Sequence, residues 1–384
     1  MLELGIDEMT IILQPSPSVK AGLTPSNWPG IAEAMIRTFE GKAGFATILG
    51  GRHTAKQAPS GYSTAYVYGE HDFYLAVAYH PCQPRMGVIV KFSAQALAYY
   101  LEATGRRAFQ FLQAVVDSRY TIRLSRVDVT ADFIDEGIDV TKIYQGFIDN
   151  KIGVFRESIG KTTGQVEYRR VEMQYRGFLR GQEVPTLYLG SSMSSSLLRV
   201  YDKRLEQIER RGSKLAKAVQ SHDWVRFEGC FKHEYAHQIS EQLLKVRSDD
   251  EFGNLVAGLL TQKFRLMYID RGVVEDDTEY TRALLDCITN NSFTLTAPLS
   301  RNFDLARSLE HLLYGSGAVS TLYKVQMIWG KAATRDALDL IEQRVDVLVP
   351  NEDTRRWLRN NMGDYQRHYH DFDTFKTDNL AVVV

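Results

Sequence analysis

A tyrosine flanked by two basic residues is the first candidate for chemistry in this 384-residue chain. The segment 197–203 reads LLRVYDK, and its alternation is typical of a short β-strand. Side chains two residues apart share one face of a strand, so Arg199 and Lys203 would flank Tyr201. Two cations favour a phenolate and bind phosphate, which makes Tyr201 a candidate nucleophile. The alternative is an ordinary strand tyrosine with solvated basic neighbours.

Two further segments carry carboxylates in strand-like patterns. In 125–133, SRVDVTADF, Asp128 and Asp132 alternate with small apolar residues and share a face. In 224–232, WVRFEGCFK, Glu228 points away from the apolar side chains. If these strands are neighbours, the three carboxylates repel one another unless a cation lies between them, which indicates Mg²⁺ or Mn²⁺. The alternative is that each carboxylate pairs with an arginine or caps a turn.

Positive charge gathers around Tyr201, although the whole chain has a net charge of −1. The window 151–217 holds 14 Lys and Arg against 7 Asp and Glu, so it carries +7 and the remainder, by subtraction, −8. Aromatic residues interleave with its arginines, a mixture suited to phosphate contacts and base stacking on nucleic acid. The alternative is a solvated amphipathic hairpin. The expected nucleic-acid-binding residues are Arg169, Arg170, Arg176, Arg180, Arg204, Arg210 and Arg211.

The order of predicted elements indicates an α+β fold. We expect a catalytic domain, residues 1–270, with a mainly antiparallel sheet and flanking helices, followed by a helical C-terminal region, residues 271–384. Predicted strands outside the motifs are 8–13, 47–51, 63–68, 73–79 and 87–92. Predicted helices are 94–116, 140–150, a basic helix 203–219 with a possible break at Gly212, 240–245, 249–269, 279–289, 304–314, 320–344 and 352–361, with a linker near 275–277.

In their order and spacing these segments resemble the Rep_trans family of rolling-circle replication initiators and relaxases. The family pattern has an R-[LV]-D-x-x-x-D strand, then [TK]-x-Y-x-G, R-[IV]-Y-[DN]-K and a W-R-[VF]-E-type strand. The matching residues of this chain are 126–132, 186–190, 199–203 and 226–228, and residues 7–11 are similar to the family's first strand, D-x-[ML]-[TS]-[IV]. The resemblance extends from about residue 6 to about residue 265. Relatives of this kind occur on plasmids, filamentous phages and integrative elements.

This resemblance implies a DNA-nicking and strand-joining endonuclease or relaxase. Tyr201 would cleave one strand at an origin and leave a 5′-phosphotyrosyl enzyme and a free 3′-OH. The metal, held by the three carboxylates, would polarise the scissile phosphate, and Lys203 or Arg199 would hold one of its oxygens. Tyr188 is the competing nucleophile, because a hairpin through the serine-rich turn 191–196 would bring it close to Tyr201. The turn differs from the family pattern, which often has charged residues there.

The expected partners are DNA, as origin duplex and as single strand, a host helicase, and a second copy of the chain in a homodimer. The 271–384 region suits origin or partner binding, because its long predicted helices are amphipathic. No run of 18 apolar residues and no secretory n-region is seen, so we expect no membrane partner and a location in the cytoplasm of a bacterial host.

Two other classes of function remain open from the sequence. The same sheet and arginines would serve a DNA-binding protein that does not cut, with the carboxylates in structural roles. The sequence HEYAH at 233–237 matches H-E-x-x-H, in which His233 and His237 would bind zinc and Glu234 would act as the general base of a metallopeptidase. This zinc motif directly follows a predicted strand and lacks a convincing third ligand.

Overall fold

The computed structural model describes residues 1–384 except 72, 160–163, 290–292, 297–304 and 380–384. The chain forms two compact units, Met1–Ala297 and Pro298–Val384. The first unit holds two antiparallel sheets with flanking helices, and the second is helical in its described part, so the predicted α+β class is confirmed. The first unit extends 27 residues beyond the expected boundary at 270, because one further strand completes its second sheet and one further helix packs against it.

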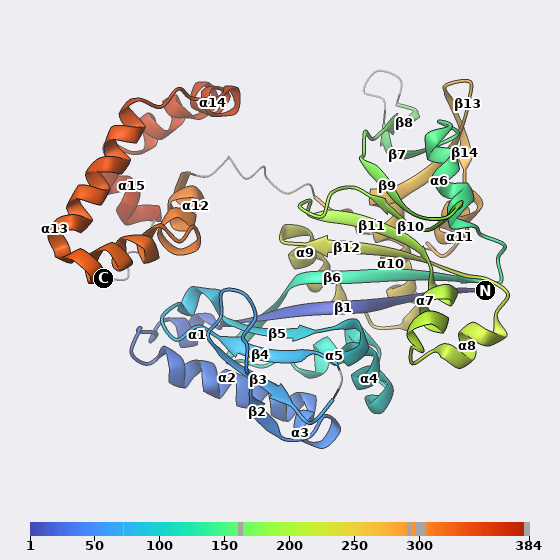
Figure 1. Ribbon diagram of the computed structural model, residues 1–384, viewed down its shortest axis with the longest axis horizontal. Helices are drawn as coiled ribbons and strands as arrows, with labels where there is room; N and C mark the ends of the chain where they lie inside the picture. The colour runs from blue at the N-terminus through green and yellow to red at the C-terminus, as the bar shows by residue number, and fades with distance from the viewer. Residues whose placement is uncertain (72, 160–163, 290–292, 297–304, 380–384) are drawn as a thin grey trace. The chain divides into compact units, whose positions relative to one another are not determined.

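The larger sheet has ten strands in the order β2-β3-β4-β5-β1-β6-β12-β11-β10-β9 (Figure 1). Every neighbouring pair in it is antiparallel. The strands are β1 (Leu2–Pro15), β2 (Arg52–Thr54), β3 (Thr64–Tyr68), β4 (Leu75–Tyr79), β5 (Val88–Phe92), β6 (Tyr120–Ile134), β9 (Tyr175–Arg180), β10 (Glu183–Leu189), β11 (Ser196–Asp202) and β12 (Trp224–Lys232).

One face of this sheet is packed against helices and forms the main core. On β6 the apolar side chains of Val127, Val129, Ala131 and Phe133 point to that face, as strand alternation requires. The covering helices are α2 (Trp28–Ala43), α3 (Phe45–Ile48), α4 (Ala94–Thr104), α5 (Ala108–Ala114), α6 (Val140–Ile148), α9 (Glu234–Leu243) and α10 (Asp249–Phe264). The opposite face of β6 and its neighbours is therefore left for polar residues. It is partly covered by α7 (Lys203–Arg210), which is followed by α8 (Leu215–Gln220).

Several predicted elements differ from the structure. The helix predicted over 249–269 ends at Phe264, because the following apolar residues form β13 (Arg265–Asp270). The residues expected as a linker belong to β14 (Val273–Asp277), and the strand predicted over 47–51 is wrong, since α3 occupies its first part. The helix over 94–116 is interrupted at Gly105, which takes a left-handed φ of 64°. The basic helix breaks as expected, between α7 and α8.

The smaller sheet has the order β14-β13-β7-β8, with β7 at Ile152–Ile159 and β8 at Val166–Arg170. This arrangement excludes the amphipathic hairpin that was the alternative interpretation of these segments. β8 pairs with β7 in the smaller sheet, whereas β9 pairs with β10 in the larger one. Arg169 and Arg170 therefore belong to a different sheet from Arg176 and Arg180.

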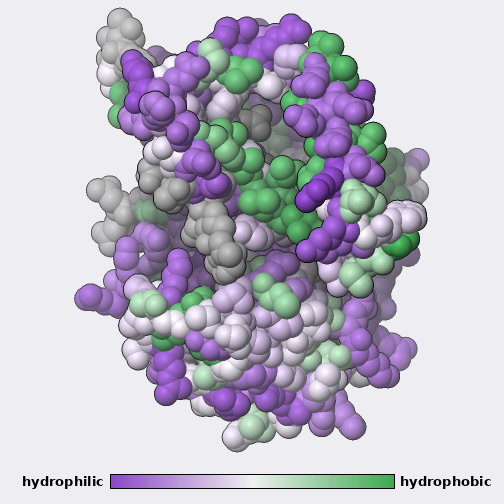
Figure 2. All heavy atoms as spheres, turned by 90° about the vertical axis from the view of Figure 1, so that its left-hand side faces the viewer, coloured by the Kyte–Doolittle hydropathy of each residue, from purple (hydrophilic) through white to green (hydrophobic). Residues whose placement is uncertain are grey.

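The second unit contains α12 (Leu305–Glu310), a π-helical turn (His311–Gly315), α13 (Ala318–Asp346), α14 (Glu352–His368) and α15 (Phe372–Asn379). A kink divides α13 at Gly330, whose φ is 87°. Many apolar side chains of α13 are exposed, including Met327, Ile328 and Trp329. In the view of Figure 2, apolar residues gather in the upper part of the face that is turned to the reader. Of the helices in the described residues, none combines the length and the apolar character needed to cross a membrane.

The boundary between the units is testable by truncation. A chain ending at 270 lacks β14 and α11 (Glu279–Asp286), which supply the buried Tyr280 and the Asp277 carboxylate that binds Arg265 through two hydrogen bonds of 2.7 and 2.6 Å. We expect the 1–270 chain to be insoluble or to unfold roughly 5–10 °C below the 1–297 chain in a thermal melt. Equal solubility and equal melting temperatures would show that the first unit ends near 270.

Candidate active site

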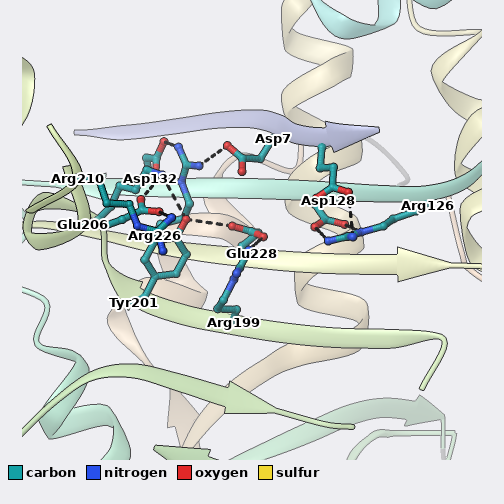
Figure 3. A network of polar contacts seen from close by, with 12 residues as sticks. Asp7, Arg126, Asp128, Asp132, Arg199, Tyr201, Glu206, Arg210, Arg226 and Glu228 are labelled. Carbon is teal, nitrogen blue, oxygen red and sulfur yellow. Dashed lines mark hydrogen bonds and ion pairs between the residues drawn. The ribbon is translucent and has the colours of Figure 1, made fainter. Parts of the chain in front are cut away.

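Strand register brings the predicted site residues onto the polar face of the large sheet (Figure 3). Glu228 on β12 lies opposite Arg199 on β11 and opposite Thr130 on β6. Tyr201 lies opposite Arg226 on one side and Thr186 on the other. Tyrosine, glutamate and arginine side chains from separate motifs therefore meet on one face.

Arg226 lies at the centre of this face and is almost fully buried. Its Nε and Nη2 donate hydrogen bonds of 2.6 and 2.7 Å to the two carboxylate oxygens of Asp132. Its Nη1 donates a third, of 2.5 Å, to Asp7 on β1. Burial raises the pKa of Asp132, but the hydrogen bonds and charge of Arg226 outweigh it and leave that pKa lowered. The pair is thus ionised and joins β1, β6 and β12.

Tyr201 is buried to 7% exposure, and its hydroxyl donates a 3.0 Å hydrogen bond to Oε2 of Glu228. The Nζ of Lys203 lies 3.4 Å from the same hydroxyl, and Arg199 lies 5.3 Å from the ring centre. Burial and then the charge of Glu228 raise the pKa of Tyr201 well above its ordinary value. This arrangement holds a neutral phenol, which corrects the expectation that the flanking cations favour a phenolate.

Glu228 is the acceptor that links these groups. It binds the Tyr201 hydroxyl and the guanidinium of Arg199 and is almost fully buried. Burial, followed by repulsion from Asp7, raises its pKa to about 7, while Arg199 acts in the opposite direction. Glu228 is therefore a carboxylate that gains a proton far more readily than an exposed one, and it is in hydrogen-bond contact with the candidate nucleophile.

The three carboxylates predicted as metal ligands are each paired with an arginine. Asp128 binds Arg126 at 2.9 and 2.6 Å, and its neighbour on β1, Glu8, binds the same arginine at 2.9 Å. Asp128 and Asp132 are four residues apart on β6, which separates their backbones by about 13 Å. Within the described residues no group of three or more Asp, Glu, His or Cys side chains is arranged to hold a metal. The structure thus does not bring the predicted triad together around one ion.

Fewer than three carboxylates are enough for a hard cation that also binds substrate phosphates. Asp7 and Asp128 both raise the pKa of Glu228 through the repulsion of their charges, so they lie within its electrostatic reach. Mg²⁺ is typically bound by one or two carboxylates together with substrate phosphates, not by a complete protein cage. Glu228 with Asp7 or Asp128 matches that pattern, and a bound cation would relieve the repulsion between them.

Tyr201 opens onto a pocket of about 330 Å³ between the sheet and α7. Thr186, Tyr188 and Arg199 line its sheet side. Of the predicted DNA-binding residues, two lie at this pocket: Arg180, which pairs with Glu209, and Arg210, which pairs with Glu206 at 3.4 Å.

The remaining basic residues lie apart from that pocket's lining. Arg204 donates to the Ser221 carbonyl at 2.9 Å, and Arg211 ends α7 with a φ of 47°. On β8, Arg169 pairs with Glu167 at 3.6 Å and Arg170 donates to Asn150 at 2.6 Å. Arg176 stacks over the ring of Tyr188 at 5.0 Å.

The zinc motif does not form the geometry that a metallopeptidase needs. α9 begins at Glu234, and His233 precedes it with a φ of 53°, so the two histidines do not share a helix face. His237 contacts Glu234 at 3.5 Å, so the residue that would act as general base is paired with a residue that would bind the zinc.

Comparison with known proteins identifies the family of this chain. A rolling-circle replication initiator protein from Geobacillus stearothermophilus is similar in fold, with a TM-score of 0.51 and 17% identity over 75% of this chain and 97% of that chain. A family model described as replication initiation factor matches residues 122–341, more than half of the chain. The chain belongs to this family, Rep_trans. A search of curated proteins finds no match.

Two residues of the site were not assigned by sequence reasoning. Arg226 and Asp7 both lie inside motifs of the resemblance but were not given a role, and Asp7 lies outside the residues 122–341 that the family model matches. A β-bulge shifts the register of β1 between Ile6 and Glu8, so Asp7 leaves the regular alternation and reaches Arg226. A cross-strand pair and a bulge of this kind have no signal in a single sequence. The pair of Arg126 and Asp128 does have a signal, because the two residues are two positions apart on one strand face.

The buried arginine gives a stability prediction. Arg226→Met leaves Asp132 and Asp7 without their cation, and we expect the free energy of unfolding to fall by about 3–5 kcal/mol in urea titrations at pH 7. Asp132 contributes its stabilisation above its unfolded pKa, near 4, and loses it as pH falls through its lowered folded pKa, so the deficit should shrink in acid. Arg169→Met, on an exposed strand, is the control and should change stability by less than about 0.5 kcal/mol. Equal effects of the two substitutions would contradict the central role of Arg226.

Proposed function

We propose that this chain is a rolling-circle replication initiator that nicks one DNA strand at an origin through Tyr201 and later rejoins it. The observation that supports this most directly is the contact of the Tyr201 hydroxyl with a carboxylate, a lysine and a pocket that opens between two basic elements. Family membership supports replication initiation.

The residues of the site suit an attack on a backbone phosphate. As the Tyr201 oxygen bonds to phosphorus, its proton passes to Glu228, the acceptor already in contact with it. The bond from phosphorus to the 3′ oxygen breaks, and that oxygen takes up a proton from solvent, which gives a 5′-phosphotyrosyl enzyme and a 3′-hydroxyl end. Lys203, 3.4 Å from the phenol oxygen, and Arg199 would stabilise the charge on the phosphate. The reverse reaction rejoins the strand, because the phosphotyrosyl bond conserves the energy of the bond that was cut.

A divalent cation, Mg²⁺ or Mn²⁺, belongs to the proposal at Glu228 and one of its acidic neighbours. When bound, it would offset negative charge on the scissile phosphate. Asp132 stays outside this donor set, because both of its carboxylate oxygens are bound to the buried Arg226. Asp128 would first have to release an oxygen from Arg126, whose side chain is 34% exposed.

The helical second unit is proposed to recognise the origin duplex or to bind a partner, such as a second copy of the chain or a host helicase. Its exposed apolar side chains support a role in contact rather than in chemistry. A protein that binds DNA without cutting it is the second candidate, since arginines neutralise all three predicted metal-ligand carboxylates in this structure.

Covalent capture tests the nucleophile. Wild-type protein mixed with cleavable single-stranded DNA and Mn²⁺ should form an adduct on a denaturing gel, and Tyr201→Phe should abolish it, because only the attacking oxygen is removed. DNA binding by Tyr201→Phe should stay within about twofold of wild type. Tyr188→Phe is the matched control and should keep the adduct. Adduct formation that survives Tyr201→Phe but not Tyr188→Phe would exchange the two roles.

Substitution of the acidic residues should distinguish those that bind the metal from those that stabilise the fold. Glu228→Gln should reduce both cleavage and Mn²⁺ affinity, measured by calorimetric titration in the Tyr201→Phe background, because a neutral amide is a poorer ligand for a hard cation. Asp128→Asn tests the neighbouring carboxylate in the same way. Asp132→Asn should instead lower the melting temperature and leave Mn²⁺ affinity unchanged. Equal loss of Mn²⁺ affinity in Asp132→Asn and Glu228→Gln would restore the original triad.

A further inference from the structure

The outer edge of the large sheet carries aromatic and basic side chains that the cleavage step does not use. β9 is the edge strand, and its Arg176 and Phe178 lie on the same face as Tyr201. Phe178 pairs with Thr186, which pairs in turn with Tyr201. Arg176 likewise pairs with Tyr188. The polar face therefore continues without interruption from the candidate nucleophile to the edge of the sheet.

These side chains form one connected surface. The rings of Phe178 and Tyr188 lie 5.7 Å apart at 63°, and the guanidinium of Arg176 lies 5.0 Å from the centre of the Tyr188 ring. Phe178 is 57% exposed, although a phenylalanine gains free energy when water is removed from it. Among the described residues, Arg176 forms no ion pair with a carboxylate, so its charge is available for an anion.

Residues of this surface line two pockets. Tyr188 lines the pocket that contains Tyr201, and Arg176 lines a second pocket of about 350 Å³ together with Gly190, Ser191 and Ser192. The stacked pair of Tyr188 and Arg176 thus stands between them. Tyr188 and Tyr201 are diagonal neighbours on adjacent strands, a separation of about 7–8 Å, which is comparable to the length of one nucleotide.

We infer that Phe178, Tyr188 and Arg176 form a platform for single-stranded DNA, on which a base next to the cleaved phosphate stacks while Arg176 binds a neighbouring phosphate. The inference rests on the proposed function and gives Tyr188 a positioning role in place of the competing nucleophilic one. Exposed aromatic rings on a sheet face bind successive bases with little dependence on sequence, and an adjacent arginine matches the charge of the backbone. The strand would run from the Tyr201 pocket across the platform into the second pocket.

Fluorescence of 2-aminopurine tests base stacking directly. Full-length Tyr201→Phe protein is mixed with the single strand that the wild type cleaves, carrying the probe at successive positions around the nick. Quenching should be strongest at one or two positions beside the nick and should disappear with Phe178→Ala and Tyr188→Leu. Tyr188→Phe keeps the ring and should keep the quenching.

Affinity and kinetics supply the second readout. Loss of a stacked base should weaken binding by about 5- to 100-fold, and Arg176→Gln should lower the salt slope by about 0.7. In the cleaving background, Phe178→Ala should raise KM with kcat retained. Tyr99→Ala, which removes an exposed ring on α4 in the first unit, is the control and should change neither readout. Unchanged quenching and affinity in Phe178→Ala would overturn the platform.

The two proposals fail in different ways. If the protein cleaves no strand, an oligo-dT strand carrying the same probe still reports stacking, because ring faces accept any base. Cleavage with no effect of Phe178→Ala rejects only the platform. Stacking without any covalent adduct supports the platform and rejects Tyr201 as the nucleophile.

Discussion

The site depends on one buried ion pair, that of Arg226 with Asp132 and Asp7. Three strands that are far apart in the sequence each place one member of this group, and the members meet only when the strand register is correct. Breaking such a pair leaves an uncompensated charge in a buried environment, which is far more costly than the pair is favourable. The same pair fixes the position of β12 against β6, and β12 carries Glu228. The contact between Glu228 and Tyr201 is therefore set by a salt bridge that takes no part in the chemistry.

This division explains why the acidic residues on one sheet face have different roles. Asp132 is fully engaged by Arg226, and Asp128 is engaged by Arg126, so both act first as structural anions. Glu228 has a single cationic partner, Arg199, and also accepts a hydrogen bond from the Tyr201 hydroxyl. Its raised pKa reflects a carboxylate held in place with less compensation than the others. Strain of this kind is expected at a functional site and is offset by the surrounding sheet.

Part of this organisation is readable from the sequence. Strand alternation correctly places Arg199, Tyr201 and Glu228 on polar faces, and the motif order correctly indicates the family. Cross-strand register is not readable, so the partner of Asp132 could not be identified. The segments around Arg170 and Arg176 look like one hairpin, yet their strands enter different sheets, because long-range pairing decides between them. The apolar run that ends α10 and begins β13 fits either a helix or a strand, and only pairing with β7 resolves it.

The central claim is that Tyr201 is the residue that becomes covalently joined to DNA. Peptide mapping of the adduct tests it most directly, since trypsin cuts after Lys and Arg and separates the two candidates: Tyr201 lies in the peptide 200–203, and Tyr188 in the peptide 181–199. After nuclease digestion of the bound strand, mass spectrometry should find the nucleotide on peptide 200–203 alone. A nucleotide found on peptide 181–199, or on neither peptide, would contradict the account.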